Sequence, residues 1–299
     1  MTLHQFCRDT CSDRGEPLPG SGTAAQRYAL LHWPRRHWRV PRTSSYDMPT
    51  ALSQAIVAAN EAGIHVALVD GDEIAFSFNG RCVRFTTPEA ASRQLLHVAA
   101  GGVLEGKVDE RLTILCCTDG KQDPCCARYG FATWKVLKDL ADPLKFRVLQ
   151  STHLGGCRFA ASLLVLPSRQ RYGRLEPGNV PEFLESLSKG IPFLPAYRGN
   201  PTLDPASQVA EHAALSFAAR HGIAADVAVL EKALPARATE EALFMARVGS
   251  LRVRIRLAQS RYEVNTRCNT IIAASSGTTD RWHLVSIEPL DSDFSVVDR

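Results

Sequence analysis

The stretch Leu115-Cys-Cys-Thr-Asp-Gly-Lys-Gln-Asp-Pro-Cys-Cys126 leaves an apolar strand pattern, forms a loop and enters a helix pattern. Further along the chain, Ser151-Thr-His-Leu-Gly-Gly-Cys157 leaves the next strand pattern. In a βαβ unit, the loops that follow the two parallel strands emerge at the same edge of the sheet. We therefore expect two thiols of the first loop to meet His153 and Cys157 of the second loop.

These four side chains are soft or borderline metal ligands. Thiolates combined with imidazole suit iron–sulfur clusters or zinc. Gly155 and Gly156 lack Cβ atoms, so the backbone can close around the site and direct its N–H groups at cluster sulfurs. Three cysteines with one histidine also form a common structural zinc site. The long first spacing and the absence of a short CxxC motif favour a [2Fe-2S] cluster over zinc.

The spacing alone leaves open which cysteines of the first loop are ligands. Cys116 with Cys125 and Cys117 with Cys126 are both nine residues apart. Neighbouring residues on a strand point to opposite faces, so at most one of Cys116 and Cys117 faces the site. The period does not say which one.

The wider pattern repeats the order strand, helix, three short strands, helix. Strand patterns cover 28–33, 64–69, 73–78 and 82–85 first, then 111–116, 146–150, 162–166 and 171–175. Helix patterns cover 49–60, 87–99, 127–140 and 180–189. This order is typical of a thioredoxin-like sheet. We predict an α/β fold, with a degenerate thioredoxin-like unit at 1–105 and a thioredoxin-like cluster-binding domain at 106–200.

The two ends of the chain have a different character. Residues 1–24 are polar and rich in turn residues, so we predict an extended lead-in. After residue 200, a helix pattern at 206–220 precedes strand patterns at 227–230, 251–257, 261–265 and 282–287. These elements predict a small α+β unit over 201–299.

Composition sets the class of protein. The 299 residues have room for two or three compact units. A hydrophobic fraction of 45% and a charged fraction of 22% are those of a soluble globular protein. No apolar run approaches the ~20 residues that cross a bilayer, and the start lacks the features of a secretion signal. We therefore expect a cytoplasmic protein.

The charge pattern gives little reason to expect a nucleic-acid partner. The formal net charge of +4 is small for this length. The basic segment Arg35-Arg36-His37-Trp38-Arg39, with Arg42 close behind, is interpreted as a solvated loop. It could also dock an acidic electron-transfer partner.

Cysteine is the informative residue type. The nine cysteines are an odd number in a chain without a signal sequence, which argues against a disulfide framework. Five of them fall between residues 116 and 157, and this clustering indicates a metal or redox site. Cys7 and Cys11 form a C-x3-C spacing without a partner pair in view, so we interpret them as ordinary thiols. Cys82 and Cys268 lie in strand patterns and are interpreted as core residues.

At these residues the chain resembles the sucrase/ferredoxin-like family, whose members are similar to thioredoxin-fold [2Fe-2S] proteins. The motifs that carry the resemblance follow one order along most of the chain. They are Cys11-Ser12, Gly15-Glu-Pro-Leu18, Trp33-Pro34, Trp38, Cys117-Thr-x-Gly120, Asp123, Cys125-Cys126-Ala127, His153-Leu-Gly-Gly156, Arg158-Phe-Ala160, Leu164-Val-Leu-Pro167, Tyr172-Gly-Arg174, Tyr197-Arg-Gly199 and Gln208-x-Ala-Glu211.

The resemblance implies the ligand set Cys117, Cys126, His153 and Cys157. The family pattern has a lone cysteine before Thr-x-Gly, which selects Cys117 and with it Cys126. Two positions depart from the family: Cys157 stands where relatives tend to carry His or Asp, and Asp119 where His is frequent. Cys157 gives three thiolates and one imidazole, so we expect a reduction potential between all-cysteine and two-histidine clusters.

The sequence thus predicts a single-electron carrier, more than a stand-alone catalyst, with redox proteins as partners. The alternative is a zinc-stabilised thioredoxin-like interaction module without a redox role. A thiol–disulfide enzyme on this fold would need a CxxC motif at a helix start, and a glycosidase would need a carboxylate pair. Neither pattern stands out.

Overall fold

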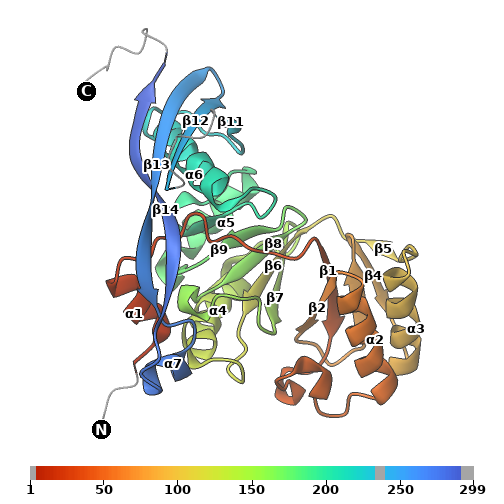
Figure 1. Cartoon of the computed structure of the whole chain (residues 1–299). Coiled ribbons are helices and arrows are strands. Elements are labelled where there is room, and N and C mark those ends of the chain that lie inside the picture. Colours follow the sequence, from red (N-terminus) through yellow and green to blue (C-terminus); the bar gives the residue numbers. More distant parts are fainter. Residues whose placement is uncertain (1–4, 233–239, 291–299) are drawn as a thin grey trace. The chain divides into compact units, whose positions relative to one another are not determined.

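The computed structural model describes residues 5–232 and 240–290 and confirms the α/β class (Figure 1). The helices are α1 (Cys7–Asp13), α2 (Thr50–Glu61), α3 (Pro88–Ala99), α4 (Phe131–Leu140), α5 (Val180–Ser188), α6 (Pro205–Arg220) and α7 (Cys268–Ile272). The strands are β1 (Arg27–His32), β2 (Ile64–Val69), β3 (Ala75–Phe78), β4 (Arg81–Arg84), β5 (Lys107–Val108), β6 (Leu112–Cys117), β7 (Phe146–Ser151), β8 (Leu163–Leu166), β9 (Gln170–Tyr172), β10 (Tyr197–Gly199), β11 (Val229–Lys232), β12 (Glu241–Val248), β13 (Leu251–Val264) and β14 (Gly277–Pro289).

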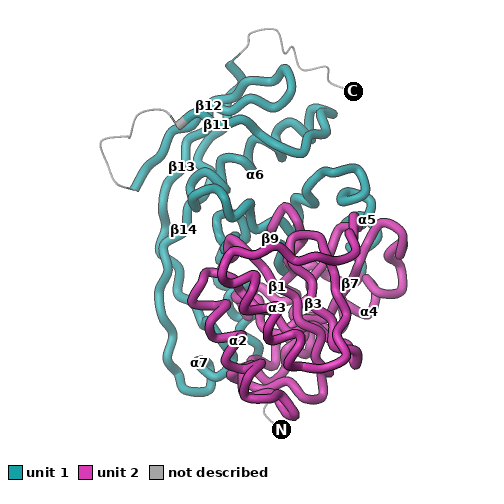
Figure 2. Tube along the Cα trace, turned by 90° about the vertical axis from the view of Figure 1, so that its right-hand side faces the viewer, with its two compact units in different colours: residues 1–23, 170–174, 178–299 teal, residues 24–169, 175–177 magenta. Residues whose placement is uncertain are grey.

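The chain forms two compact units that are not contiguous in sequence (Figure 2). Unit 1 consists of residues 1–23, 170–174 and 178–299, and unit 2 of residues 24–169 and 175–177. The predicted division into domains at residues 105 and 200 stays a prediction.

Unit 2 contains a mixed sheet with the strand order β8-β6-β7-β2-β1-β3-β4-β5. The pairs β1–β2 and β6–β7 are parallel. On their other sides, β1 pairs with antiparallel β3 and β6 with antiparallel β8. The arrangement β2-β1-β3 therefore recurs as β7-β6-β8, in keeping with the predicted repeat of element order. The two halves meet where β2 and β7 pair at Val69 and Ser151.

The first half of unit 2 has its own hydrophobic core. Apolar residues of α2 recur at i, i+3, i+4 and i+7 (Leu52, Ala55, Ile56 and Ala59), which gives the helix one stripe facing the sheet. Gly63 ends the helix segment with a φ of 78°, a conformation that favours glycine. Thr87 caps α3, because its side chain accepts a hydrogen bond from Ala90 N.

Unit 1 contains an antiparallel sheet of strands β11-β12-β13-β14 (Figure 1). Residues Leu251, Val253, Ile255 and Leu257 of β13 are buried while their neighbours are exposed, as the period of a half-buried strand requires. They pack with alanine-rich α6 in one hydrophobic core.

Two predictions for unit 1 were wrong. The polar lead-in contains helix α1, because Cys7 and Cys11 lie one turn apart and are both fully buried. The predicted strands 251–257 and 261–265 form one strand, β13, which pairs with β14 through polar Gln259 and Ser260. Strand β12 was not predicted. Residues 1–4 of the predicted lead-in lie outside the described residues.

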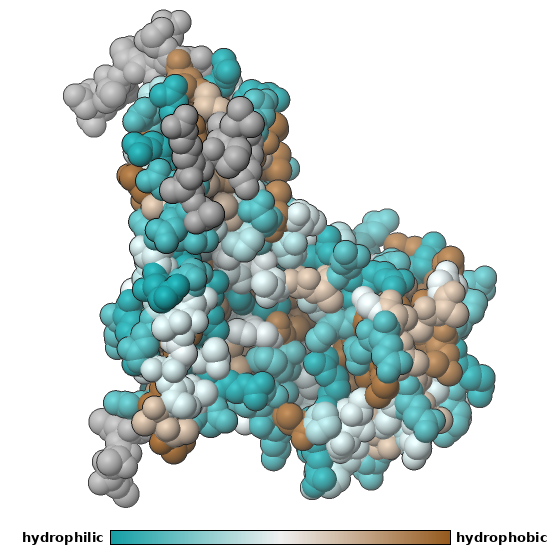
Figure 3. All heavy atoms as spheres, in the orientation of Figure 1, coloured by the Kyte–Doolittle hydropathy of each residue, from teal (hydrophilic) through white to brown (hydrophobic). Residues whose placement is uncertain are grey.

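Among the described residues, no helix has both the length and the apolarity to cross a membrane. Most large apolar side chains are buried, but some gather on the surface of unit 2 over α3 and β5 (Figure 3). Leu96, Val103 and Val108 there are 45, 69 and 51% exposed.

Candidate metal centre

The two loops singled out in the sequence begin side by side. Strand β6 ends at Cys117 and strand β7 at Ser151, and these two residues are partners in the parallel register. The N–H of Thr118 donates to the carbonyl of Ser151 at 3.2 Å, which holds the first residues of both loops together. The expected convergence therefore follows from the pairing of β6 with β7.

The four predicted ligands come together at this edge. The ligand atoms of Cys117, Cys126 and His153 all lie within 4.8 Å of one another. Cys157 Sγ lies 3.6 Å from His153 Nδ1. The three cysteines are 1, 1 and 2% exposed, whereas His153 is half-buried. The imidazole is thus the group of the four that is most open to solvent.

Local backbone structure brings each thiol to the site. Cys126 opens a π-helical turn, Cys126–Gly130, that leads into α4. A Cβ atom at Gly130 would lie 2.0 Å from the carbonyl oxygen of Cys117, so only glycine allows this turn to approach β6 so closely. Gly155 and Gly156 have φ values of 89° and 78°, a left-handed conformation that turns the chain from His153 back to Cys157.

The four candidate ligands shift one another's pKa values through hydrogen bonds. Hydrogen bonding to Cys126 lowers the pKa of the Cys117 thiol well below its usual value, and the same contact raises the pKa of Cys126. Contact with Cys126 and His153 lowers the pKa of Cys157 to about 7. Burial opposes protonation of His153, but hydrogen bonds to Cys117 and Cys157 raise its pKa to about 10. The contacts therefore favour the protonated form of the imidazole and the ionised forms of the Cys117 and Cys157 thiols.

Two further polar residues surround this group. Asp119 Oδ2 accepts a hydrogen bond from the backbone N–H of His153 at 3.2 Å, and burial raises the pKa of Asp119. Arg42 donates to Nε2 of His65 at 3.0 Å and to the carbonyl of Val66. Burial lowers the pKa of Arg42, whereas the charges of Asp119 and Cys117 raise it, so its guanidinium lies within electrostatic reach of the thiols.

Arg42 is the residue that sequence reasoning missed. The basic segment before it is interpreted as a solvated loop. Arg36 and Arg39 are exposed, but Trp38 is 2% exposed and Arg42 is half-buried. The only available signal was its place directly after the basic segment, which does not distinguish a buried arginine from a solvated one.

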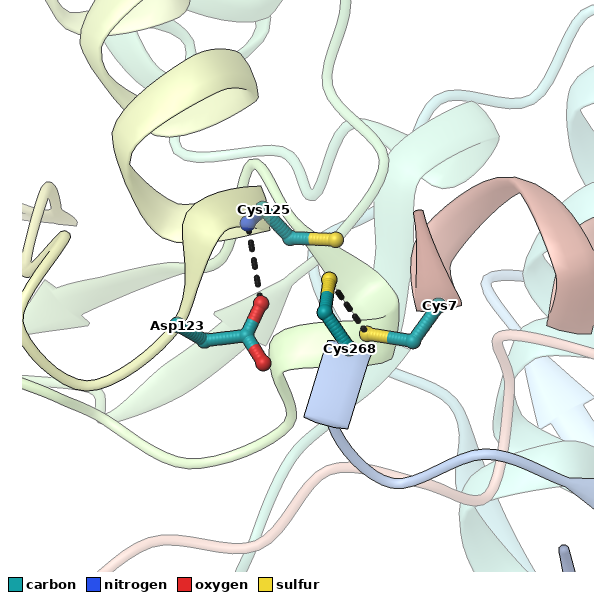
Figure 4. Close-up of side chains that lie close together, drawn as sticks. All are labelled: Cys7, Asp123, Cys125 and Cys268. Atoms are coloured by element: carbon teal, nitrogen blue, oxygen red, sulfur yellow. Dashed lines mark hydrogen bonds between the residues drawn. The ribbon is translucent and has the colours of Figure 1, made fainter. Parts of the chain in front are cut away.

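The neighbouring cysteines point elsewhere. Cys116 Sγ donates to the carbonyl of Gly130 at 3.3 Å, on the face of β6 opposite to that of Cys117. The backbone N–H of Cys125 donates to Asp123 Oδ1 at 2.8 Å (Figure 4), and its thiol is not part of the group around His153. The geometry therefore separates the two cysteine pairs that spacing left open.

Unit 1 holds a second close contact between thiols. Cys268 Sγ donates to Cys7 Sγ at 3.8 Å (Figure 4), and Cys11 Sγ hydrogen-bonds to the backbone N–H and carbonyl of Asn265. Cys268 begins α7 and not a strand, which corrects the sequence interpretation. Cys82 lies in β4 as predicted but is only half-buried.

Comparison with known proteins adds a family match. The family model described as Sucrase/ferredoxin-like matches residues 18–199. No curated protein sequence matches this chain. A solved thioredoxin-like [2Fe-2S] ferredoxin from Aquifex aeolicus shows 19% sequence identity and a TM-score of 0.27, covering 29% of this chain and 90% of the ferredoxin. A wild-type structure of that ferredoxin at 1.5 Å resolution gives 20% identity, a TM-score of 0.27 and 29% and 96% coverage.

Proposed function

Because the chain belongs to the sucrase/ferredoxin-like family, we propose that it binds one [2Fe-2S] cluster through Cys117, Cys126, His153 and Cys157 and transfers single electrons between redox proteins. The convergence of three thiols and one imidazole on the edge shared by β6 and β7 carries this proposal. When bound, such a cluster accepts and releases one electron at a time.

The donor set fits an iron–sulfur cluster. Thiolates and imidazole are the ligands that iron–sulfur sites use, and all three thiols are almost fully buried. With one imidazole among the ligands, the oxidised site carries one negative charge less than an all-cysteine site. It therefore accepts an electron more readily than an all-cysteine site and less readily than a two-histidine site, between roughly −400 mV and −150 mV.

The half-buried imidazole of His153 is the part of the site that a partner protein could approach. The thiols are shielded by the chain, whereas His153 reaches the surface. Electron exchange with another protein is therefore expected to run through the His153 side of the site. Asp119 and the turn at Gly155 fix the backbone on either side of this imidazole.

Binding of the cluster releases protons from the chain. Ligation requires thiolates and a neutral imidazole. Cys117 and Cys157 have lowered pKa values, whereas His153 and Cys126 hold their protons to higher pH. Reconstitution with iron and sulfide should therefore proceed further at pH 8.5 than at pH 6.5.

An absorption spectrum of protein purified under argon, recorded before and after dithionite, tests the proposal. Iron and acid-labile sulfide are assayed on the same sample. Visible charge-transfer bands that bleach on reduction, with about two irons and two sulfides per chain, are the expected result.

Colourless protein would be tested again after anaerobic reconstitution, because a cluster can be lost during purification. Protein that stays colourless and instead holds one zinc per chain would overturn the electron-transfer proposal. The same donor set would then serve a zinc-stabilised interaction module, because three cysteines and one histidine also suit structural zinc.

A further inference from the structure

Unit 2 contains a cationic cleft at the end of its strands opposite to the candidate metal centre. The cleft has a volume of about 280 Å³ and is lined by residues at the start of β1 and around the start of β6. The candidate ligand Cys117 is the last residue of β6. A strand rises about 3.3 Å per residue, so the cleft and the candidate cluster lie some 15–20 Å apart. A ligand in the cleft would not contact the cluster.

The cleft combines an apolar floor with a strong excess of positive charge. Leu30 and Phe78 on its floor are 3 and 6% exposed. Five arginines line it, against the two carboxylates of Asp109 and Glu110, an excess of three positive charges. The arginines are Arg27, Arg81, Arg111, Arg147 and Arg169.

Asp109 balances only part of this charge. Its two carboxylate oxygens each accept a hydrogen bond from Arg111 at 2.8 Å, and one lies 3.9 Å from Arg147 Nη1. The hydrogen bond from Arg111 lowers the pKa of Asp109, so this carboxylate is ionised, and both of its oxygens already accept hydrogen bonds from Arg111.

The side chain of Arg147 is 13% exposed, against 39% for that of Arg111. It donates to Ser77 Oγ at 2.9 Å and lies 2.8 Å from His32 Nε2. Burial, with the nearby charge of Arg147, lowers the pKa of His32 to about 4, so His32 is neutral at pH 7. Neither neighbour offsets the charge of Arg147, and Asp109 is shared with Arg111.

The other three arginines have no carboxylate partner in the part of the chain that the structure describes. Arg27 donates to the carbonyl of Ala62, and Arg81 donates to that of Gly106 at 3.0 Å. Arg169 donates to two backbone carbonyls at 3.3 Å. A carbonyl accepts a hydrogen bond but carries no full charge, so these guanidinium groups keep their charge and further N–H donors.

We propose that this cleft binds a small organic anion that carries at least two negative charges on an apolar body. Guanidinium groups bind carboxylates and phosphates through paired, charge-assisted hydrogen bonds. The floor at Leu30 and Phe78 contacts the apolar part, as in ligand pockets generally. Phosphate esters and polycarboxylates share this chemistry. The proposal is independent of the cluster, because no cleft residue belongs to the candidate metal centre.

Isothermal titration calorimetry on the full chain tests the proposal with four probes. Phenyl phosphate and phthalate carry two charges on an aromatic ring. Inorganic phosphate carries the charge without the ring, and benzyl alcohol the ring without the charge. At least one aromatic anion is expected to bind at millimolar concentration or below, with a Kd about tenfold or more below those of the other two probes. Tighter binding of phenyl phosphate assigns a phosphate ester, and tighter binding of phthalate a polycarboxylate.

Variants tie the binding to the cleft. The double variant Arg81→Gln with Arg169→Gln is expected to raise the Kd by about tenfold or more. The control Lys135→Gln with Lys138→Gln removes the same charge from exposed positions on α4 and should leave the Kd unchanged. Arg81→Gln alone replaces the double variant if circular dichroism shows that the latter does not fold. Absence of binding by both aromatic anions, or equal weakening in the cleft and control variants, would overturn the proposal.

Discussion

At the scale of residues, Cys157 sets the character of the candidate centre. It lies against His153 and brings the candidate donor set to three thiols and one imidazole. Hydrogen bonding to Cys126 and then to His153 lowers the pKa of Cys157 to about 7, and Cys157, after Cys117, helps to raise the pKa of His153 to about 10. One side chain therefore contributes to both the donor set and the charge of the site.

The adjacent cysteines provide a matched test of ligation. We expect Cys117→Ser and Cys126→Ser to lose most of the bound iron, because serine replaces a ligand thiol at a buried position. Cys116→Ser and Cys125→Ser change the next residue in the same way and should retain about two irons per chain. Iron and sulfide analysis of the four variants measures this. Equal iron loss in both sets would mean that the adjacent thiols also serve as ligands.

The imidazole ligand should be visible in the reduction potential. Replacing His153 by cysteine adds a negative charge to the site, so the potential should fall toward about −400 mV. A single histidine ligand can lose a proton on oxidation, so the wild-type potential should also decrease at alkaline pH, and that of His153→Cys should not. Spectroelectrochemical titration across pH measures both effects. An unchanged potential in His153→Cys would exclude His153 as a ligand.

At the scale of elements, the close approach of the π-helical turn Cys126–Gly130 to β6 brings two candidate ligands together. The turn can approach only because Gly130 lacks a Cβ atom. This contact acts together with hydrogen bonds inside the loop, such as that from Cys126 N to the carbonyl of Asp123 at 3.1 Å.

Gly130→Ala tests that contact. A methyl group would overlap the carbonyl oxygen of Cys117, so we expect a loss of about 1–3 kcal/mol in the free energy of unfolding and a lower iron content. Gly178→Ala is the control, because a Cβ atom there meets nothing within 4 Å. Urea unfolding of the two variants compares them. A Gly130→Ala protein as stable as the control would show that the turn can move without cost.

Glu211 of α6, which contacts β10, should make a contribution to stability that falls as the pH rises. Tyr197 Oη donates to Glu211 Oε2 at 3.0 Å, and burial raises the pKa of Glu211 from 4.5 to about 7. Between these values the folded state binds more protons at Glu211 than the unfolded state. The contribution of this group to stability is therefore fully present below pH 4.5 and is lost as the pH rises through 7.

Glu211→Gln keeps an acceptor for Tyr197 but removes the titration. It should raise the free energy of unfolding by about 2–3 kcal/mol at pH 8 and by little at pH 4.5. Thermal unfolding of both proteins across this range measures the difference. A difference that does not change with pH would rule out Glu211 as the titrating group.

The sequence predicted these elements unevenly. The strand and helix patterns of residues 24–190 predicted β1, β2, α2, α3, β6, β7 and α5 within a few residues, because each has a clear apolar period or a strong cap. Helix α1 was missed because its buried face, Cys7 and Cys11, depends on partners such as Asn265 far along the chain. At the candidate site, the loops and ligand types followed from order and spacing. Spacing alone could not show that Cys117 and not Cys116 faces the site, because each has a cysteine nine residues further along the chain.

At the scale of the whole molecule, unit 1 is built from both ends of the chain. Gln208 donates to the carbonyl of Gly22 and accepts from its N–H, at 2.8 and 2.9 Å. Arg281 donates to the buried carboxylate of Glu16 at 2.9 and 3.1 Å. Residues 5–23 therefore make several of their polar contacts with the segment after residue 200.

Shortening the chain to residues 1–200 tests this dependence. The shortened chain loses Gln208, Asn265 and Arg281, so Glu16 loses its hydrogen bonds from Arg281 and Gly22 loses those with Gln208. Residues 5–23 should therefore become sensitive to protease. A chain ending at residue 290 keeps all three partners and is the control. Limited proteolysis followed by mass spectrometry locates the cuts. A segment 1–23 that resists cleavage in the shortened chain would show that it folds without those partners.

The order of synthesis adds a consequence of this arrangement. Cys11 and Asn265, which hydrogen-bond in unit 1, are 254 residues apart in the chain. At about 5–20 residues per second, a ribosome takes tens of seconds to pass from one to the other. Residues 24–169 of unit 2 emerge within that interval. Until the residues after 200 are synthesised, the amino-terminal segment lacks these hydrogen-bond partners and is accessible to chaperones and proteases. By then, the part of the chain that carries the candidate metal ligands has already been synthesised.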